Sequence, residues 1–314
     1  MKARLVALAY AGGWALVRSL PERLVSVLFR LGADVAWRRG GTGVRRLEGN
    51  LRRVVGPGVP ADALAALTRA GVRSYARYWL EVFRLPVTPQ ERTVARTRLH
   101  DEFHLRDAFA SGRGVICALP HSGNWDQAGA WATATGMPFT TVAERLEPAG
   151  VFEQFVRFRE GLGMEVVPLT GGERPPFALL AERLRAGGML CLLGDRDLTE
   201  SGIEVDFFGA RTRMPAGPAA LAVRTGAVLL PCSLWYDGPD MHLRIHPEVV
   251  AAAGLTGRDR IADMTQRVAG AFAEGIAAHP QDWHMLQRLW LDDLDRDDPR
   301  RAPVAVPADV DAAS

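Results

Sequence analysis

The sequence predicts an α/β protein with a mainly parallel central sheet, helices on both faces of that sheet, and a helical region at the N-terminus. Short apolar runs, such as GVICALP at 114–120 and MLCLLG at 189–194, alternate with helical segments at the spacing of βαβ units. The 48% hydrophobic and 24% charged residues are ordinary for a globular chain, which excludes collagen-like, coiled-coil and wholly disordered proteins.

The expected elements follow from apolar periodicity and from glycine and proline breaks. An apolar stretch at 5–17 precedes helices at 22–37 and 61–84, with Pro57 and Pro60 between them. Strands are expected at 114–120, 139–144, 164–169, 189–194, 207–208, 227–236 and 241–247. Helices are expected at 126–135, 151–162, 176–186, 215–226 and 259–279. Three regions result: a helical N-terminal region (1–60), an α/β domain (61–295) and an Asp/Pro/Ala-rich tail (296–314) expected to be disordered.

Charge is distributed unevenly along a chain whose formal net charge is only +2, which argues against a nucleic-acid partner. Residues 1–53 carry eleven Lys/Arg against three acids, which indicates an anionic membrane surface as partner. On the 22–37 helix an apolar stripe, Leu24, Leu28, Leu31 and Val35, is typical of an interfacial helix. The alternative is an ordinary helix facing the core, with solvated arginines.

The first apolar stretch has 13 uncharged residues between Arg4 and Arg18, whereas a membrane-spanning helix needs about 20. We therefore expect peripheral membrane association and no spanning helix. A secretory signal peptide is the competing interpretation, because Lys2 and Arg4 precede an apolar stretch of suitable length.

The strongest chemical pattern follows the strand at 114–120, where the chain reads HSGNWD. His121 ends a buried strand, Asp126 begins a helix, and ligands of open parallel sheets bind at such strand ends. Histidine has an unperturbed pKa of about 6.5, which suits proton transfer near neutral pH. The sequence lacks G-x-S-x-G, and Ser122 directly follows His121, which is poor geometry for a nucleophile. The pattern favours a histidine base acting on the substrate's own hydroxyl; a helix-capping Asp beside an ordinary His is the structural alternative.

A second apolar strand ends in Asp195, Arg196 and Asp197. If the two strands are neighbours, Asp195 or Asp197 meets the imidazole, and Asp195 is the preferred carboxylate to orient His121 in place of Asp126. A solvated loop is the alternative, and the orienting carboxylate stays open. Glu144 and Arg159 are expected to line the same crevice, as a functional pair or as a structural salt bridge.

Arginines in VDFFGARTRMPAGPA, Arg211 and Arg213, are candidates for binding phosphate, with surface arginines beside a hydrophobic turn as the alternative. We expect no metal, because His100 and His104 have no third ligand at the required spacing. We expect no nucleotide cofactor either, since no P-loop or strand-to-helix G-x-G-x-x-G is present. The three cysteines lie in apolar runs and are expected to act as small core residues.

Several segments together resemble the actinobacterial phosphatidylinositol mannoside acyltransferases, which are relatives of the lipid A late acyltransferases. The segments are HSGNWD, VAERLEP, FVRFRE, PLTGG, DRDLTESGIEVDFFGARTRMPAGPA and DWHMLQRLW, within residues 70–292. The resemblance implies transfer of a long-chain acyl group from acyl-CoA, or acyl carrier protein, to a mannose hydroxyl of a phosphatidylinositol mannoside. It implies a peripheral enzyme on the cytoplasmic face of the cell membrane, with no cofactor.

The resemblance also assigns roles to individual residues. It makes His121 the base and Asp126 the second half of H-x-x-x-x-D, with Glu144, Arg159 and Asp195 as polar site residues and Arg213 as a phosphate ligand. We expect the amides around Ser122, Gly123 and Asn124 to stabilise the oxyanion of the transition state. Another glycolipid or lysophospholipid acceptor, a lipid hydrolase using the same residues, and a non-catalytic membrane-binding protein remain alternatives.

Overall fold

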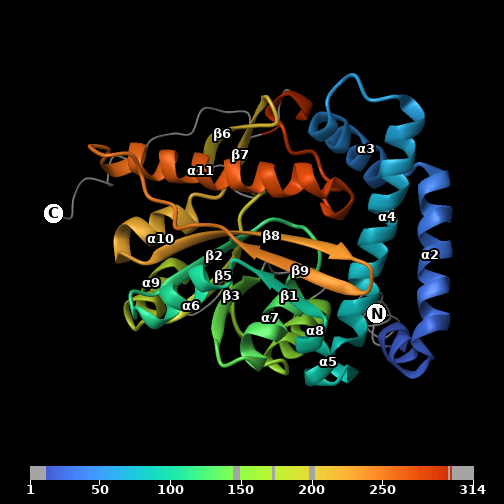
Figure 1. Cartoon of the computed structure of the whole chain (residues 1–314), viewed down its shortest axis with the longest axis horizontal. Coiled ribbons are helices and arrows are strands. Elements are labelled where there is room, and N and C mark those ends of the chain that lie inside the picture. The colour runs from blue at the N-terminus through green and yellow to red at the C-terminus, as the bar shows by residue number, and fades with distance from the viewer. Residues whose placement is uncertain (1–11, 144–148, 172–173, 198–201, 296–297, 299–314) are drawn as a thin grey trace.

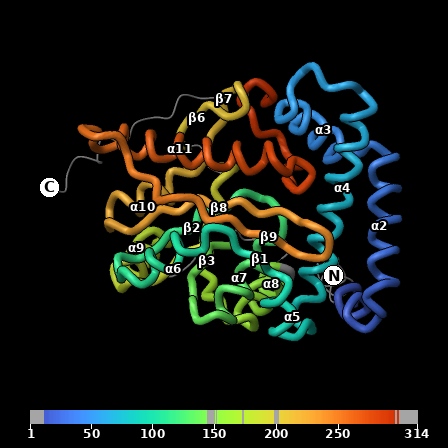
Figure 2. The backbone as a smooth tube through the Cα atoms, in the orientation of Figure 1, coloured from blue at the N-terminus to red at the C-terminus, as the bar shows by residue number. Residues whose placement is uncertain are grey.

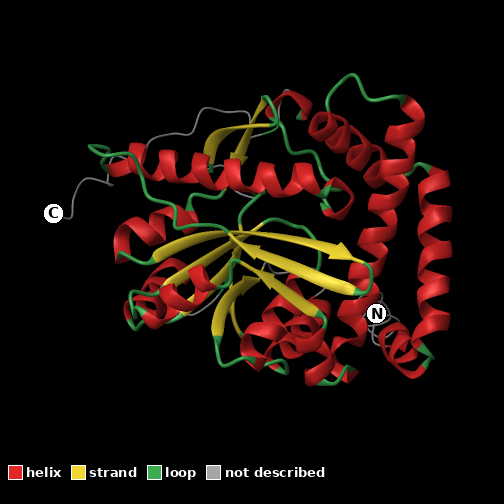
Figure 3. Cartoon of the chain, in the orientation of Figure 1, coloured by secondary structure: helices red, strands yellow, loops and turns green. Residues whose placement is uncertain are grey.

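A seven-stranded sheet forms the centre of the computed structural model, which describes residues 12–143, 149–171, 174–197, 202–295 and 298 (Figures 1 and 3). The strand order is β1-β9-β8-β2-β5-β3-β4. The bounds are β1 Thr97–His100, β2 Val115–Leu119, β3 Phe139–Ala143, β4 Glu165–Pro168, β5 Met189–Leu193, β8 Val228–Asp237 and β9 Asp240–Ile245. Strands β8, β2, β5, β3 and β4 pair in parallel, whereas β9 is antiparallel to β8 and β1 is parallel to β9. The prediction of a mainly parallel sheet is confirmed.

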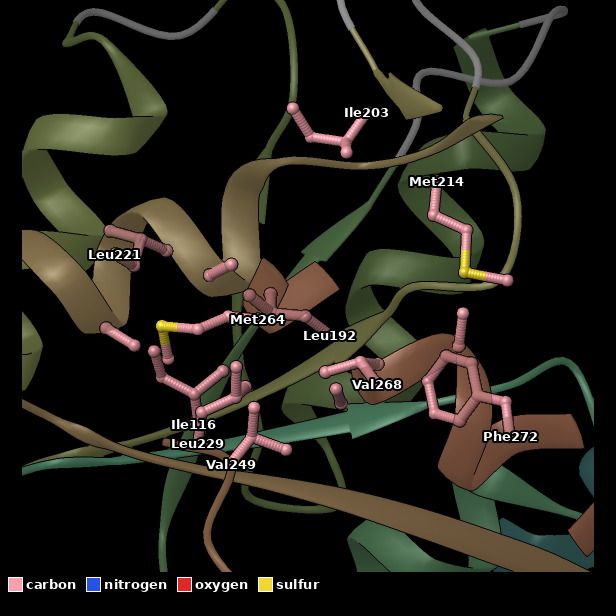
Figure 4. Close-up of a cluster of buried hydrophobic side chains, with 14 of the residues drawn as sticks. Ile116, Leu192, Ile203, Met214, Leu221, Leu229, Val249, Met264, Val268 and Phe272 are labelled. Atoms are coloured by element: carbon pink, nitrogen blue, oxygen red, sulfur yellow. The ribbon is translucent and has the colours of Figure 1, made fainter. Parts of the chain in front are cut away.

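Helices cover both faces of this sheet, also as predicted (Figure 1). One face packs against α9 (Pro176–Arg185), α10 (Gly217–Thr225) and α11 (Gly257–Ala278), and the other against α6 (Phe103–Ala110), α7 (Trp125–Ala134) and α8 (Ala149–Glu160). Strand β2 is buried on both faces, since Ile116 belongs to the first apolar cluster and Cys117 to the second. Figure 4 shows the first cluster, in which side chains of α10 and α11 meet those of β2, β5 and β8.

Three helices stand together at one end of the molecule: α2 (Glu22–Arg39), α3 (Thr42–Val55) and α4 (Ala61–Arg84) (Figures 1 and 2). Leu47 and Leu51 of α3 pack with Leu64 of α4 in a buried cluster of their own. Residues 12–19 are also helical, and Trp14 is buried with its indole N–H donating to the Phe83 carbonyl at 2.8 Å. Residues 5–11 of the expected first segment lie outside the described residues.

The apolar stripe of α2 faces away from the body of the protein. Leu24, Leu28, Leu31 and Val35 are 47%, 50%, 55% and 42% exposed, whereas Val25 and Ala33 are buried. The alternative interpretation, in which this apolar stripe faces the protein core, is therefore wrong. Within the described ranges, no helix is long and apolar enough to cross a membrane.

Several elements differ from those expected. Residues 207–208 belong to β6 (Ile203–Phe207) and its turn, and β6 pairs antiparallel with β7 (Ala210–Met214) in a separate two-stranded hairpin. Phe208 and Gly209 form the connection with φ of 49° and 73°, as a two-residue hairpin turn requires. Strand β1, α3, α5 (Gln90–Ala95) and α6 were not predicted, and all but one residue of the 296–314 tail lies outside the described residues.

Candidate active site

Two parallel strands end side by side and bring His121 to Asp195. Strands β2 and β5 are neighbours with Leu119 opposite Leu193, and the Gly194 amide donates to the Leu119 carbonyl at 2.9 Å. His121 and Asp195 each follow two residues later, which places both beyond the carboxyl edge of the sheet. The His121 Nδ1 lies 2.5 Å from the Asp195 Oδ1. The expected meeting of these two side chains is therefore present.

Asp195 is a fully buried carboxylate held by three donors. Its Oδ1 accepts from the His121 ring, and its Oδ2 accepts from the His121 backbone amide at 2.9 Å and the Trp283 indole at 2.9 Å. Burial alone raises the pKa of Asp195, but the His121 charge and these hydrogen bonds outweigh it and hold the pKa below its ordinary value. An ionised Asp195 requires the proton of a neutral His121 on Nδ1, which leaves Nε2 as a proton acceptor. The His121 side chain is 22% exposed and so remains accessible.

Asp126 has different partners. It is 2% exposed and accepts from the Arg159 Nε at 2.7 Å and from the Tyr78 hydroxyl at 2.9 Å. Burial, followed by the charge of Asp126, raises the pKa of Tyr78 well above its ordinary value, so its hydroxyl stays a donor. The carboxylate that contacts His121 is thus Asp195, and Asp126 ties α4, α7 and α8 together beside it. Arg159 pairs with Asp126, and Glu144 lies outside the described residues.

The polar groups of the turn from His121 to α7 form hydrogen bonds within the protein that fix the turn. The Asn124 side chain caps α7 by accepting from the Gln127 amide at 2.9 Å and donates to Glu81 at 2.9 Å. The Ser122 amide donates to the Pro120 carbonyl at 2.7 Å, and the Gly123 amide to the Asp282 carbonyl at 2.9 Å. The Ser122 and Gly123 amides thus already have backbone acceptors in this structure, and the expectation that the amides around Ser122, Gly123 and Asn124 stabilise an oxyanion stays a prediction. Gly123 has φ of 56°, and a Cβ there would lie 3.0 Å from Leu234.

Residues 282–284, which the sequence analysis did not assign to the site, hydrogen-bond to this turn. The His284 amide donates to the His121 carbonyl at 2.7 Å, and the Asp282 carbonyl accepts from Gly123. Between them, Trp283 is fully buried and donates to Asp195. The segment DWHMLQRLW was noticed as part of the resemblance, but nothing local in it indicates a bond to a residue 88 positions earlier.

Helix α4 fixes the position of residues 282–284. Ser74 donates to the Asp282 carboxylate at 2.6 Å and lies 2.9 Å from the His284 Nε2, and all three residues are buried. Burial, with a smaller effect of the His121 charge, lowers the pKa of His284 to about 3. His284 is therefore neutral near pH 7 and acts as a structural partner of Ser74.

The remaining candidates have partners elsewhere. The Asp197 carboxylate accepts from the Gly202 amide at 2.9 Å, and its own amide donates to the Arg213 carbonyl at 3.3 Å. Arg211 and Arg213 lie on β7 and both contact Glu204 of β6, at 2.8 and 3.2 Å. The Arg213 side chain is only 3% exposed, which makes it a poor first contact for a ligand phosphate.

An apolar cavity of about 70 Å³ adjoins the His121 site under α7. Its polar end is formed by Trp125, Asp126 and Arg159, and the Trp125 ring lies 5.6 Å from the His121 ring. Leu119 and Leu193, the last residues of the strands that lead to His121 and Asp195, also line it. The three cysteines contribute to its wall as small apolar side chains. A carboxylate-oriented imidazole beside an apolar cavity has the composition needed for base catalysis on a lipid.

Known proteins of similar sequence are acyltransferases. The family model for bacterial lipid A biosynthesis acyltransferases matches residues 1–292. A phosphatidylinositol mannoside acyltransferase of Mycolicibacterium smegmatis is 50% identical over 295 residues, covering 94% of each chain. The protein of the same name in Mycobacterium tuberculosis is 50% identical over 289 residues, covering 91% of this chain and 89% of the relative.

Proposed function

This chain belongs to the bacterial lipid A biosynthesis acyltransferase family, and on that premise we propose that it transfers a long-chain acyl group from acyl-CoA to a mannose hydroxyl of a phosphatidylinositol mannoside. The names of relatives at 50% identity support the acceptor. The observation that carries the chemistry is the hydrogen bond between His121 and the buried Asp195 carboxylate, beside an apolar cavity.

In the proposed reaction His121 is the general base. Its Nε2 takes the proton of the mannose hydroxyl while that oxygen attacks the thioester carbonyl carbon. The tetrahedral intermediate collapses with cleavage of the C–S bond, and the imidazolium returns the proton to the departing thiolate. Asp195 keeps the proton of the neutral ring on Nδ1 and stabilises the imidazolium by its charge.

The transfer is proposed to be direct, without an acyl-enzyme. Ser122 follows His121 immediately, and its buried Oγ makes no hydrogen bond within the described part of the chain. A nucleophilic serine needs its base within hydrogen-bond reach. An acyl group trapped on Ser122 would contradict the direct route.

Asp126 and Arg159 are proposed to shape the substrate site instead of moving protons. Their ion pair closes the polar end of the cavity, at 2.7 Å and with both side chains largely buried. The cavity of about 70 Å³ holds only the first few carbons of an acyl chain, so a long chain must displace lining side chains to enter further. A thioester bound in this way would have its carbonyl near this pair and near His121. The proposal needs no metal or redox cofactor, because the base and the leaving thiolate exchange only a proton.

Membrane association is proposed to be peripheral, on the cytoplasmic face of the cell membrane. The four exposed apolar side chains of the α2 stripe lie on a helix that also carries Arg23, Arg30, Arg38 and Arg39. An apolar stripe with flanking arginines suits insertion among anionic headgroups.

The test is incubation with labelled acyl-CoA and a panel of mannosylated and unmannosylated phosphoinositides. Transfer of label to the mannosylated lipids alone supports the proposed acceptor. Transfer of label to a lysophospholipid or another glycolipid would show that the acceptor is a different lipid. Release of free fatty acid without need of an acceptor would identify a hydrolase. Membrane binding without transfer or hydrolysis would identify a non-catalytic membrane-binding protein.

A further inference from the structure

A second and larger cavity, of about 630 Å³, lies among α2, α4, α5 and the β8–β9 hairpin, elements that meet at the N-terminal end of the molecule (Figures 1 and 2). His121 does not line it. Its most distinctive feature is a concentration of guanidinium groups from α2, α4, and α5 with its C-cap residue. The six are Arg30, Arg73, Arg77, Arg84, Arg92 and Arg96. The cavity-lining carboxylates are Glu22, Glu81 and Asp282.

These three carboxylates are fewer than the six arginines, and Asp34, which does not line the cavity, adds a fourth by pairing with Arg73 at 2.6 Å. Glu22 accepts two hydrogen bonds from Arg92, at 2.8 and 2.7 Å, and is also the nearest carboxylate to Arg96, at 3.9 Å. Glu81 pairs with Arg77 at 2.7 Å. One carboxylate thus serves two guanidinium groups at the α2–α5 side of the cavity.

Two further arginines have no acidic partner among the described residues. One Arg84 amino group donates to the carbonyls of Val17 and Leu20, at 2.7 and 2.9 Å, which are neutral acceptors. Arg30 is exposed on α2, and among the described residues it makes no ion pair. Like charges gathered in a recess focus a positive potential and favour an anion there.

We propose that this arginine cavity binds a phosphate group. Guanidinium forks match phosphate oxygens in pairs, which suits Arg more than any other side chain. The α2 residues that line the cavity, Glu22, Ser26, Phe29 and Arg30, lie at helical positions opposite the exposed stripe, so the cavity and the stripe are on different faces of α2. The peripheral membrane association proposed above would keep the cavity close to phospholipid headgroups, so a lipid headgroup is the favoured source over a soluble phosphate compound.

The site is separate from the proposed acyl transfer, and its test uses binding without turnover. The variant Arg30→Gln/Arg96→Gln removes two charges from the cavity and no ion pair shorter than 3.9 Å. The matched control is Arg185→Gln/Arg260→Gln, which removes the same charge from exposed positions on α9 and α11. Thermal unfolding checks that each variant folds, and Arg30→Gln alone serves as a second variant at an exposed position.

Inorganic pyrophosphate titrated into the full chain by calorimetry is the soluble probe. We expect the cavity variant to bind it at least about tenfold more weakly than the wild type, and the control to bind as the wild type does. No binding by the wild type, or equal loss in the control, overturns the proposal.

Phosphatidylcholine vesicles with and without phosphatidylinositol form the second arm. A phosphatidylinositol-dependent binding that the cavity variant loses and the control keeps identifies a lipid headgroup as the source. If the variant loses pyrophosphate binding but keeps vesicle binding, the phosphate comes from a soluble compound. The acyl-transfer rate enters neither result, so failure here is distinguishable from failure of the proposed reaction.

Discussion

Replacement of Asp195 by asparagine reverses the polarity of one hydrogen bond at the proposed base. Two donors converge on the Asp195 Oδ2, the His121 amide and the Trp283 indole, whereas among the described residues Oδ1 receives only the His121 ring. The asparagine oxygen will occupy the Oδ2 position, because the opposite orientation would set two donors against an NH₂ group. Its NH₂ group then faces Nδ1 and forces the ring proton onto Nε2.

In that tautomer Nε2 cannot accept the proton of the acceptor hydroxyl. The corresponding change in a serine-protease triad lowers kcat by about 10⁴, equivalent to about 5 kcal/mol of transition-state stabilisation. We expect a loss of similar size in Asp195→Asn, with the KM for acyl-CoA little changed because no binding contact is removed.

The assay is the initial rate of label transfer from acyl-CoA to a mannosylated phosphoinositide in mixed micelles. Circular dichroism and thermal unfolding show whether the variant folds. Asp206→Asn, an exposed position on β6, is the matched control and should retain the wild-type rate. A rate for folded Asp195→Asn within tenfold of wild type would refute the role of Asp195 in setting the tautomer.

Other expectations follow from the same contacts. Trp283→Phe removes one donor to Asp195 and should lower kcat by about 10- to 100-fold, since a hydrogen bond to a charged group contributes about 1.5–3 kcal/mol; an unchanged kcat would contradict this. Leu28→Glu/Leu31→Glu should weaken binding to anionic vesicles in a flotation assay without changing the unfolding temperature, because both side chains are exposed; unchanged flotation would argue against docking through α2. EDTA should leave transfer unchanged, and a loss restored by added metal would show that the reaction needs one.

Acid should destabilise the protein through His284. Its pKa is about 3 in the folded state against about 6.5 unfolded, so between these values the unfolded chain binds a proton that the folded chain does not. This contribution to stability is present above pH 6.5 and falls by about 1.4 kcal/mol per pH unit as the pH drops toward 3. The raised pKa of Asp282 opposes part of the effect, so the measurement is the difference in denaturant unfolding between wild type and His284→Gln. Parallel pH profiles would contradict the assignment.

The geometry that the sequence could predict rests on the parallel sheet. Two apolar runs ending in His121 and Asp195 predicted that both side chains meet at one edge if the two strands are neighbours, because parallel neighbouring strands finish together, and the structure shows that they are neighbours. The exposed stripe of α2 was predicted as one of two alternatives, and only tertiary packing distinguishes them. Periodicity shows which face of a helix is apolar, but not what that face contacts.

The rest depends on contacts that local patterns do not encode. Strand β1 has only four residues, TRLH, and exists through pairing with β9 more than 140 positions later. The sequence left open whether Asp126 or the preferred Asp195 orients His121, and only the folded chain shows that the Asp126 carboxylate faces Tyr78 and Arg159. The amides of Ser122 and Gly123 looked free at a helix start. The hydrogen bond from the Gly123 amide to the Asp282 carbonyl becomes visible only in the folded chain.

The most direct test of the central claim compares wild type with His121→Ala, using labelled acyl-CoA and a purified phosphatidylinositol mannoside. The proposed reaction predicts label on a mannose hydroxyl with the wild type, and no transfer above background with a variant that folds normally. Transfer by His121→Ala within tenfold of the wild-type rate would contradict the assignment of the catalytic base.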